Sequence, residues 1–570
     1  MQHVLIINLK RLGDVYTTAN LVSALKSQSP NTEVTMLVFD ECAGAARNIA
    51  NIDHILTINR KEIITLKVNK IFSDGMAVEN LFEALKPLKS SQWDRIVNFS
   101  NDKISAYIAS YLNTNSNGKK IGVNFSADKS ISYNSEWDIV YNELVATTEN
   151  TPFSFVDTLL KMNGVDEEKT KSKLIMSRKH TENAERNIAH LKKKFQTDLN
   201  TPARVIGIQI FSSHKAKQIG HETLKGVINK LISDSRYIPL VLIAPIESER
   251  VFAQNLNQEL GNQLIIAEAD LSALASVLTS IDFLLTPDTV TKHIADLCKT
   301  PCLEVSLGSA PLFKQGSKNP ESFVLTPFAP SRVFSNVENN FLNSETTDQS
   351  DVIQVSDILN CIEFFFSGEN TNLVPVLSEN VTLYRPVSDQ AGVRLQAVCG
   401  KISGDYESVR LLSRYLIAKS LGTDLNDEII EYCANTLVKD LPRWMDEQKT
   451  FVTNITKDLL STLRALIQAQ ESKKKVIEFV TNLDRLLANT DDRSLISPFV
   501  KIFRGKVEAL SGEGFTDNIR ELEGLLYELK SDLQKVLQVL KDVETSWTTK
   551  RKDSLKKAST QNAPSIMPRA

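Results

Sequence analysis

VLIINLKRLGD, residues 4–14, is the stretch that sets the pattern of the whole chain. Its apolar run, residues 4–7, predicts a buried strand, and the helical spacing over residues 15–25 predicts that a helix follows. Open α/β sheets bind ligands at the carboxyl ends of their strands, so the turn in between is a candidate site. From this stretch alone the simpler interpretation is favoured, in which Gly13 makes a tight turn and Asp14 caps the helix. The turn carries two cations, a glycine and a carboxylate: Lys10, Arg11, Gly13 and Asp14.

The alternation of strand-like and helix-like runs continues through residues 1–175. This alternation favours a parallel, doubly wound sheet. The pattern Gly-x-Gly-x-x-Gly is absent after the first strand, so the usual dinucleotide-binding fingerprint is not met. Further strands are predicted at residues 33–39, 53–58, 95–99 and 120–123, and helices at 78–86 and 104–112.

The same pattern starts again in residues 200–366. A lysine-rich helical stretch at 181–195 leads to a predicted hinge at 200–202. Two successive α/β units joined by one hinge predict a two-lobed enzyme with a cleft between the lobes. The strands of the second unit are predicted at residues 205–210, 239–244, 264–267 and 283–286, with a helix at 271–278.

Two loops of this second half place polar groups at strand ends. In the first, residues 211–217, the hydroxyls of Ser212 and Ser213 precede lysines that include Lys217. Hydroxyl donors and positive charge at a helix start suit a phosphate. The alternative, favoured for this loop taken alone, is a solvated loop with a serine cap.

The second loop spans residues 286–295. A strand ends at Pro287 and a helix begins near Asp288 or Thr289. The unpaired backbone N–H groups of that helix end would face the cleft and favour an anion. His293 lies near the helix start, where the commoner case is a half-buried histidine with satisfied hydrogen bonds.

Composition argues against several classes of protein. Lys and Arg total 66 and Asp and Glu total 69, which leaves a net charge of -3 and no sign of nucleic-acid binding or of a general affinity for anionic membranes. The six cysteines are scattered without zinc spacing, so we expect them to be reduced and structural, and we expect no metal site. The apolar runs are too short for a signal peptide or a membrane span. We therefore expect a cytoplasmic protein, free or peripheral at the inner membrane.

In this order, the motifs resemble those of the ADP-heptose:lipopolysaccharide heptosyltransferases, glycosyltransferases of family 9 with the two-lobed GT-B fold. The resemblance runs from Met1 to about Phe366. Residues 5–15 look like the family's strand followed by (Lys/Arg)-x-Gly-Asp-Val, and residues 217–222 stand where the family usually has Lys-x-Trp-Pro. Residues 287–295 resemble Asp-(Ser/Thr)-x-x-x-His-Leu-Ala. The combination is more specific than any single motif.

The resemblance implies an inverting sugar transfer without a metal ion. The only small molecule implied besides the acceptor is a nucleotide-diphosphate sugar, with an ADP-sugar favoured. Asp14 would be the general base that takes the proton of the acceptor hydroxyl.

The resemblance also assigns roles to the other motif residues. Asp288 and His293 would contact the donor sugar. Side chains and backbone N–H groups would hold the leaving phosphates: Ser212, Ser213, Lys217, Thr289, Val290 and Thr291. An anionic acceptor or the diphosphate would be contacted by Lys10, Arg11 and Gly13.

The chain departs from the family pattern at several places. Ile219 and Gly220 replace the tryptophan and the proline, and Val290 stands where many members have glycine. No clear equivalent exists for the acidic residue that holds the nucleotide ribose, and Glu247 and Glu249 are the nearest candidates. The identity of the donor is therefore open at this point.

Residues 370–550 lie beyond the usual end of the family and predict a helical bundle, after short strands and turns at 373–400. The last helix repeats apolar residues at alternating steps of four and three from Leu522 to Trp547, which is a heptad seam. The favoured alternative is a bundle that packs its own seams. The other is a module for a protein partner, for self-association or for a protein acceptor. Residues 551–570 are expected to be a disordered tail.

Two functions stay open. The first is a glycosyltransferase that moves a heptose-like sugar to a glycan, lipid-linked or protein acceptor. The second is a catalytically inactive, glycosyltransferase-like scaffold whose helical part mediates protein–protein interaction. The presence of Asp14, Lys217 and Asp288 favours the first, and the departures from the family pattern leave room for the second.

Overall fold

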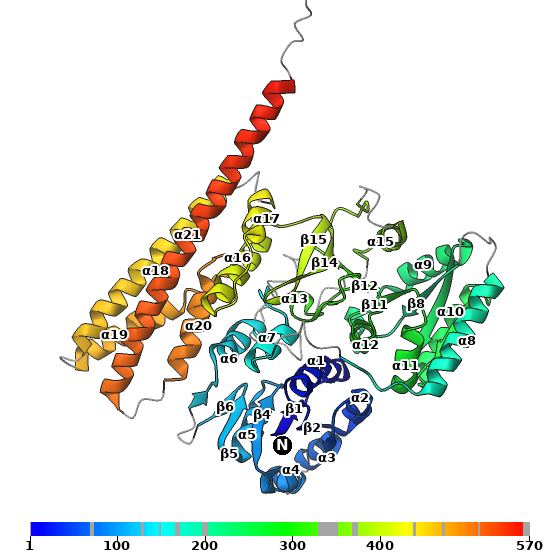
Figure 1. Cartoon of the computed structure of the whole chain (residues 1–570), viewed down its shortest axis with the longest axis horizontal. Coiled ribbons are helices and arrows are strands. Elements are labelled where there is room, and N and C mark those ends of the chain that lie inside the picture. The colour runs from blue at the N-terminus through cyan, green and yellow to red at the C-terminus, as the bar shows by residue number, and fades with distance from the viewer. Residues whose placement is uncertain are drawn as a thin grey trace, which may run out of the picture. The chain divides into compact units, whose positions relative to one another are not determined.

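The computed structural model shows two units, Met1–Ile402 and Ser403–Ala570, which are described separately (Figure 1). The predicted hinge at 200–202 lies outside the described residues. The structure describes residues 2–68, 73–126, 130–147, 150–165, 172–195, 203–328, 351–367, 374–436, 441–469, 473–510 and 514–561.

Lobe 1, the N-terminal part of the first unit, is built on a parallel sheet in the order β3-β2-β1-β4-β5. β1 is central because residues 4–7 are apolar and fully buried. The strand order reverses at β1, so the turn that carries Asp14 begins at the topological switch point. The strands are β1 (Gln2–Ile7), β2 (Thr32–Phe39), β3 (His54–Ile58), β4 (Trp93–Asn98) and β5 (Thr114–Ile121).

Helices cover both faces of this sheet. α1 (Leu12–Gln28) and α2 (Ala43–Asn48) follow β1 and β2. α3 (Arg60–Lys67), α4 (Ser73–Ser90) and α5 (Lys103–Tyr111) lie on the opposite face, because right-handed crossovers return across the sheet there. α4 and α5 pack against the sheet through an apolar cluster of strand and helix residues. This cluster includes Leu5, Ile7, Leu85 and Ile108. Lobe 1 also contains β6 (Asn124–Phe125), β7 (Ile131–Ser132), α6 (Glu136–Val140), the π-helix η2 (Tyr141–Val145) and α7 (Phe155–Met162).

Lobe 2 repeats this design on a larger sheet, in the order β10-β9-β8-β11-β12-β13-β14-β15. The order again reverses beside β8, so the loops that follow β8 and β11 meet at a second switch point. Two doubly wound lobes are the GT-B arrangement, and the predicted fold class is confirmed. The six parallel strands are β8 (Arg204–Gln209), β9 (Tyr237–Ile243), β10 (Ile265–Glu268), β11 (Phe283–Pro287), β12 (Cys302–Val305) and β13 (Phe323–Pro327).

The helices of this part begin with α8 (Arg178–Phe195), which precedes the strands of lobe 2. A 3-10 turn, η4 (Lys215–Lys217), lies in the loop between β8 and α9. The other helices are α9 (His221–Ser233), α10 (Glu247–Glu259), α11 (Leu271–Leu278), α12 (Val290–Cys298), α13 (Leu312–Gln315) and α15 (Val355–Ser367).

The first unit ends at Ile402, and the predicted end of the second lobe at residue 366 is wrong. A hairpin of β14 (Val381–Asp389) and β15 (Gly392–Gly400) follows α15, and β14 pairs antiparallel with β13. The sequence predicted short strands and turns at 373–400 but assigned them to the domain that follows lobe 2. Val381 and Leu383 pack into the apolar core of lobe 2, so the hairpin completes the sheet and does not open a new domain.

The same hairpin links the two lobes. Asp157 on α7 of lobe 1 is buried, and its Oδ2 accepts a 2.9 Å hydrogen bond from the backbone N–H of Val393. Its Oδ1 lies 3.0 Å from Nζ of Lys318 in lobe 2. Nζ of Lys161 donates a hydrogen bond of 3.3 Å to the carbonyl of Gln390. These contacts hold α7 against lobe 2.

The second unit is helical in its described part, as predicted. Its heptad seam is buried from Leu522 to Val543, where α21 packs on α17, α18 and α20. The unit therefore packs its own seam, which is the favoured alternative. The helices are α16 (Gly404–Ser420), α17 (Glu428–Thr436), α18 (Leu441–Ala469), α19 (Lys473–Leu487), α20 (Ser497–Glu508) and α21 (Phe515–Gln561).

α21 continues to Gln561, into the segment that we expected to be a disordered tail. No proline or glycine interrupts the chain between Gly524 and Pro564, and most of the intervening residues are good helix formers. Residues 562–570 lie outside the described residues. No helix in the described part of the chain combines the length and the apolar character needed to cross a bilayer.

Candidate active site

Asp14 is held by hydrogen bonds to both of its carboxylate oxygens. The backbone N–H of Arg11, the residue before α1, donates to Oδ2 of Asp14 at 3.2 Å, so Asp14 does cap the helix. Oδ1 accepts a hydrogen bond of 2.7 Å from Nε2 of Gln315. Nδ2 of Asn8 donates to the backbone carbonyl of Asp14 at 2.9 Å and fixes the turn. The carboxylate is therefore oriented where β1 ends.

Gln315 is a site residue that the sequence analysis missed. It ends α13 in lobe 2, 301 positions from Asp14. Its backbone carbonyl also accepts a hydrogen bond from Nζ of the buried Lys292. A single glutamine outside any motif gives no sequence signal, so only its two contacts identify it.

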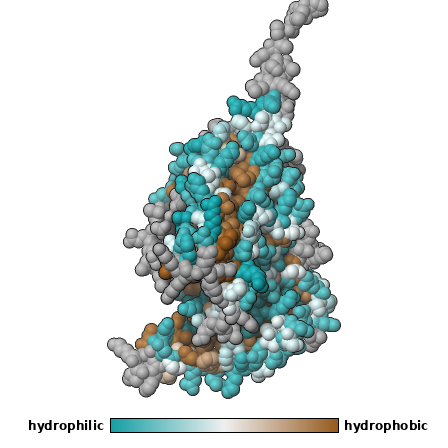
Figure 2. Space-filling view, turned by 90° about the vertical axis from the view of Figure 1, so that its left-hand side faces the viewer, coloured by the Kyte–Doolittle hydropathy of each residue, from teal (hydrophilic) through white to brown (hydrophobic). Residues whose placement is uncertain are grey.

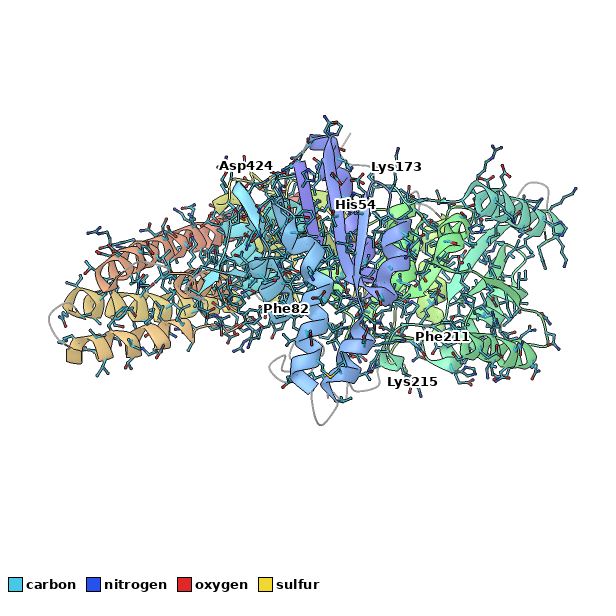
Figure 3. The ribbon with its side chains drawn as sticks, turned by 90° about the horizontal axis from the view of Figure 1, so that it is seen from below. His54, Phe82, Lys173, Phe211, Lys215 and Asp424 are labelled. Carbon is cyan, nitrogen blue, oxygen red and sulfur yellow. The ribbon has the colours of Figure 1, made fainter. Side chains whose placement is uncertain are left out.

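The turn before α1 touches lobe 2 at two further points. A Cβ atom on Gly13 would lie 2.7 Å from Cδ2 of His293, so glycine is needed for α1 to approach α12 this closely. Nη1 of Arg11 lies 3.4 Å from the hydroxyl of Ser213 in the β8–α9 loop. Figure 3 labels Lys215 of this loop, where the helices of lobe 1 meet lobe 2. Motifs predicted separately are thus brought together.

A buried cluster of charges surrounds the start of α12. Nζ of Lys217 lies 2.6 Å from Oδ2 of Asp288, and Nζ of Lys292 lies 3.2 Å from its Oδ1. Lys292 also faces Glu304 at 3.8 Å. Burial alone would raise the pKa of Asp288, but the ammonium groups of Lys292 and Lys217 lower it. Burial raises the pKa of Glu304 to about 7. The start of α12 therefore brings the ammonium groups of Lys217 and Lys292 together on one buried carboxylate.

Three predicted side chains make other contacts. Oγ1 of Thr291 donates to Oε1 of Gln209 at 2.9 Å, inside lobe 2. Oγ of Ser212 donates to the backbone carbonyl of His214 at 2.9 Å, and Nζ of Lys10 lies 3.3 Å from a carboxylate oxygen of Asp102 in lobe 1. These three side chains are therefore engaged within their own lobes.

The N-terminus of α12 has no side-chain cap. Thr289, the residue before the helix, has an extended backbone, and its side chain makes no capping hydrogen bond. Val290 is half-buried at the first helical position. Uncapped backbone N–H groups at a helix start attract anions, so this end of α12 is suited to a phosphate.

The lobes are closed on each other beside Asp14. A cavity of about 30 Å³ lies between α1 and α12, and its lining includes Tyr16, Thr17, His293 and Gln315. This volume suits about one water molecule. No three His, Cys, Asp or Glu side chains in the described ranges are grouped so that they could hold a metal ion.

The buried imidazole of His293 makes the stability of the first unit depend on pH. Burial, together with repulsion from Lys292 and Lys217, holds the pKa of its imidazole well below the ordinary value. In the unfolded chain the imidazole binds a proton near pH 6.5, whereas in the folded chain it stays neutral. The unfolded state therefore binds more protons below about pH 6.5, and the free energy of unfolding falls as the pH falls through this region.

We expect wild type to lose more stability than His293→Gln between about pH 7 and about pH 5. Urea unfolding at a series of pH values measures the difference. Parallel pH profiles for the two proteins would contradict the prediction, because the other histidines are common to both.

Part of this chain is similar to proteins of a known family. Residues 81–318 match the family model "Glycosyltransferase family 9 (heptosyltransferase)". Over these residues, less than half of the chain, the protein is similar to the family 9 glycosyltransferases. The resemblance seen in the sequence is confirmed for these residues, which include Ser212, Lys217 and Asp288, whereas Asp14 precedes them. No curated protein sequence matches the chain.

Solved structures similar to the family 9 domain share few identical residues with it. A glycosyl transferase family 9 protein from Veillonella parvula is 15% identical, with a TM-score of 0.46 over 64% of this chain and 97% of that one. E. coli heptosyltransferase WaaC with ADP is 14% identical, with a TM-score of 0.41 over 57% and 93%. E. coli ADP-heptose lps heptosyltransferase II is 13% identical, with a TM-score of 0.39 over 57% and 90%.

Proposed function

We propose that the family 9 domain transfers a sugar from a nucleotide-diphosphate donor to an acceptor hydroxyl, with inversion and without a metal ion. The main support for the proposal is the carboxylate of Asp14. Hydrogen bonds from Arg11 and Gln315 orient it at the switch point of lobe 1. The ammonium groups of Lys217 and Lys292 lie at the switch point of lobe 2. A base on one lobe and a site for the leaving group on the other are the parts that this reaction needs.

In the proposed reaction the acceptor hydroxyl attacks the anomeric carbon from the face opposite the diphosphate. Asp14 takes the hydroxyl proton as the new C–O bond forms. The bond between the anomeric carbon and the diphosphate oxygen breaks, and the diphosphate leaves with the electron pair. A single displacement of this kind inverts the configuration. Gln315 keeps Oδ1 of Asp14 in position, so it is a positioning residue.

N–H donors and positive charge stabilise the departing diphosphate. The uncapped end of α12, at Thr289 and Val290, supplies backbone N–H groups and the positive end of the helix dipole. Lys217 has two further N–H donors besides the one that faces Asp288. In the proposal Asp288, with its second oxygen on Lys292, also receives the hydroxyls of the donor sugar.

The donor enters when the two lobes part. A cavity of about 30 Å³ is far smaller than a site for a drug-sized ligand, which takes roughly 300 Å³ or more. Closure after binding would then exclude water and complete the site. An ADP-linked, heptose-like sugar is the proposed donor, supported by the family 9 match. A glycan, a lipid-linked glycan or a protein is the proposed acceptor.

Binding and turnover of nucleotide sugars test the proposal. The full chain is titrated with ADP-, UDP- and GDP-sugars in a calorimeter, and nucleotide release is followed with candidate acceptors. We expect binding of one nucleotide class and release of that nucleotide only when an acceptor is present. Absence of binding to all three classes would favour the scaffold alternative.

Replacing Gln315 by methionine removes the hydrogen bond to Asp14 and keeps the size of the side chain. A hydrogen bond to a charged group contributes about 1.5–3 kcal/mol, so we expect kcat to fall by about tenfold to a hundredfold. The backbone carbonyl of Gln315 still accepts from Lys292, so the loss of stability should not exceed the contribution of the one hydrogen bond that is removed. Steady-state kinetics measure the effect, and an unchanged kcat would show that Gln315 does not position the base.

One observation favours the scaffold alternative as a second candidate. The α18–α19 hairpin of the second unit exposes large apolar side chains, and Figure 2 shows an apolar stripe over the helical unit. Such a stripe suits a protein partner or a second copy of the chain. Sedimentation of the full chain distinguishes self-association from a monomer. The exposed residues are Leu460, Ile467, Ile477 and Val480.

A further inference from the structure

A second cleft opens at the amino edge of the lobe 1 sheet, beside Gln2 at the start of β1 and Asn31 just before β2. Its volume of about 500 Å³ falls within the range of small-molecule sites, roughly 300–1,000 Å³. The Asp14 turn follows the other end of β1. At about 3.3 Å per residue, the six residues of this strand keep the two places roughly 15–20 Å apart. The cleft is therefore separate from the candidate active site.

Two cations line this cleft side by side. Arg95 on β4 and Lys119 on β5 are partners in the register of the two strands, so their side chains project from the same face of the sheet. Neither cation forms an ion pair with a carboxylate of the described chain. Burial lowers the pKa of Arg95, but a guanidinium stays protonated in proteins. Like charges on neighbouring strands repel, so an anion bound between them would stabilise the pair.

The guanidinium of Arg95 is held in place and keeps unused donors. Nη1 donates to the backbone carbonyl of Asn163, at the end of α7, at 3.2 Å. No described residue accepts a hydrogen bond from Nε or Nη2 of Arg95, or from Nζ of Lys119. A guanidinium fork binds a phosphate through two parallel N–H donors, and a lysine adds a point charge. The pair is thus equipped to hold a phosphate group.

A bulge in β5 shapes one wall of the cleft. The pairing of β4 with β5 shifts in register between Trp93 and Arg95, and residues 115–118 have no partner on β4. A Cβ atom on Gly118 would lie 2.6 Å from the backbone carbonyl oxygen of Trp93, so glycine lets the bulge pack this closely. The bulge brings Asn117 into the lining of the cleft.

The lining of the cleft is polar throughout its described part. No apolar or aromatic residue of the described chain lines it, so it offers no surface for a nucleobase or an acyl chain. Amides and hydroxyls both donate and accept hydrogen bonds, which suits the hydroxyls of a sugar. The uncharged lining residues are Gln2, Ser29, Asn31 and Asn117.

Asp94 is the one carboxylate among the described lining residues. Its Oδ2 accepts a hydrogen bond of 2.7 Å from the backbone N–H of His3, and its Oδ1 accepts one of 2.7 Å from Nδ2 of Asn115. These donors, foremost the N–H of His3, hold the pKa of Asp94 below its ordinary value. The carboxylate is therefore ionised and fixed, and its remaining lone pairs can accept from hydroxyl groups.

We propose that this cleft is a second ligand site, which binds a phosphorylated sugar. The phosphate lies between Arg95 and Lys119, and the sugar hydroxyls bond to the amides of the lining and to Asp94. The proposal does not depend on the proposed function, because the cleft and the Asp14 turn lie at opposite edges of the sheet.

Calorimetric titration of the full chain in a phosphate-free buffer tests the proposal. Glucose 6-phosphate, glucose and inorganic phosphate are each used as a probe. We expect glucose 6-phosphate to bind, and each of the other two to bind at least about tenfold more weakly, since each makes only part of the contacts. Wild type that does not bind glucose 6-phosphate, or binds inorganic phosphate equally well, would overturn the proposal.

Two exposed positions in the lining provide variants that should fold. Lys119→Met removes one cation, and Asn117→Asp places a negative charge beside the phosphate. Each should lower the binding constant for glucose 6-phosphate about tenfold. Lys86→Met is the matched control, because Lys86 lies on α4 and pairs with Glu83 at 3.4 Å, outside the cleft. Circular dichroism checks folding, and cleft variants that bind as tightly as this control would contradict the proposal.

Competition with a nucleotide sugar separates this proposal from the proposed function. The titration with glucose 6-phosphate is repeated in the presence of millimolar ADP-glucose, and the affinity should be unchanged. Displacement by ADP-glucose would place the sugar phosphate in the candidate active site and overturn the second site. Binding of glucose 6-phosphate by a protein that binds no nucleotide sugar would support the second site and reject the transferase mechanism.

Discussion

Asp14→Asn is expected to lower the rate of sugar transfer by about a hundredfold to ten-thousandfold, because asparagine cannot take the proton of the acceptor hydroxyl. The single amide oxygen can still accept from the N–H of Arg11 and cap α1, and Nδ2 can donate to the side-chain oxygen of Gln315 once that amide turns over, so the turn should keep its shape. Affinity for the nucleotide sugar is expected to stay close to wild type, because the donor contacts lie in lobe 2. Single-turnover kinetics and calorimetry measure the two quantities separately.

Asp102→Asn is the matched control for this experiment. Asp102 lies at the end of the neighbouring strand β4, contacts Lys10 at 3.3 Å, and caps α5 through the N–H of Ser105. Asparagine is an equally good cap, so its effect on transfer should be small. If Asp14→Asn transfers sugar at the rate of Asp102→Asn, Asp14 is not the base. If Asp14→Asn loses donor binding as well, its role is structural.

Lys292→Met is expected to cause the largest loss of stability. The lysine side chain has no exposed surface and lies between Asp288, at 3.2 Å, and Glu304, at 3.8 Å. Removing one partner of a buried ion pair leaves an uncompensated charge and typically costs about 3–5 kcal/mol of the free energy of unfolding. The pKa of Asp288 should rise, since one of the two ammonium groups that lower it is removed.

Urea unfolding of unit 1 measures this loss. Two of the four tryptophans, Trp93 and Trp137, lie in unit 1, so Trp444→Phe/Trp547→Phe gives a background whose fluorescence reports on unit 1 alone. Lys225→Met is the control: Lys225 pairs with Glu222 and Glu259 at the surface of α9, and its loss should change little. Equal midpoints for the two lysine variants would contradict a stabilising role for the buried cluster.

The positions of the strands and helices in the first unit could be predicted from the local pattern of apolar and polar residues. Fully buried apolar runs of the kind found at residues 4–7 form central strands of parallel sheets, because both faces are covered by helices. The ends of β1, β8 and β11 carry the predicted motifs, and parallel pairing brings strand ends of one sheet to the same edge. These features depend on neighbours in the sequence, so the sequence was sufficient to predict them.

The limit of the first unit was mispredicted for a physical reason. β14 and β15 have the length and alternation of ordinary antiparallel strands, and nothing in their own residues tells which sheet they join. β13 offers a free edge, and the core of lobe 2 offers space for Val381 and Leu383. Both conditions exist only once the six parallel strands are assembled.

By itself, the sequence determined that two α/β lobes are followed by helices, and that a carboxylate lies just after the first strand. Spacing and composition carry that information, because they act over a few residues. Tertiary structure alone decided that Gln315 meets Asp14, that Gly13 lies against the ring of His293, and that Lys217 pairs with Asp288. These contacts join residues that lie far apart in the chain or in different lobes, and their geometry is set by the packing of whole lobes.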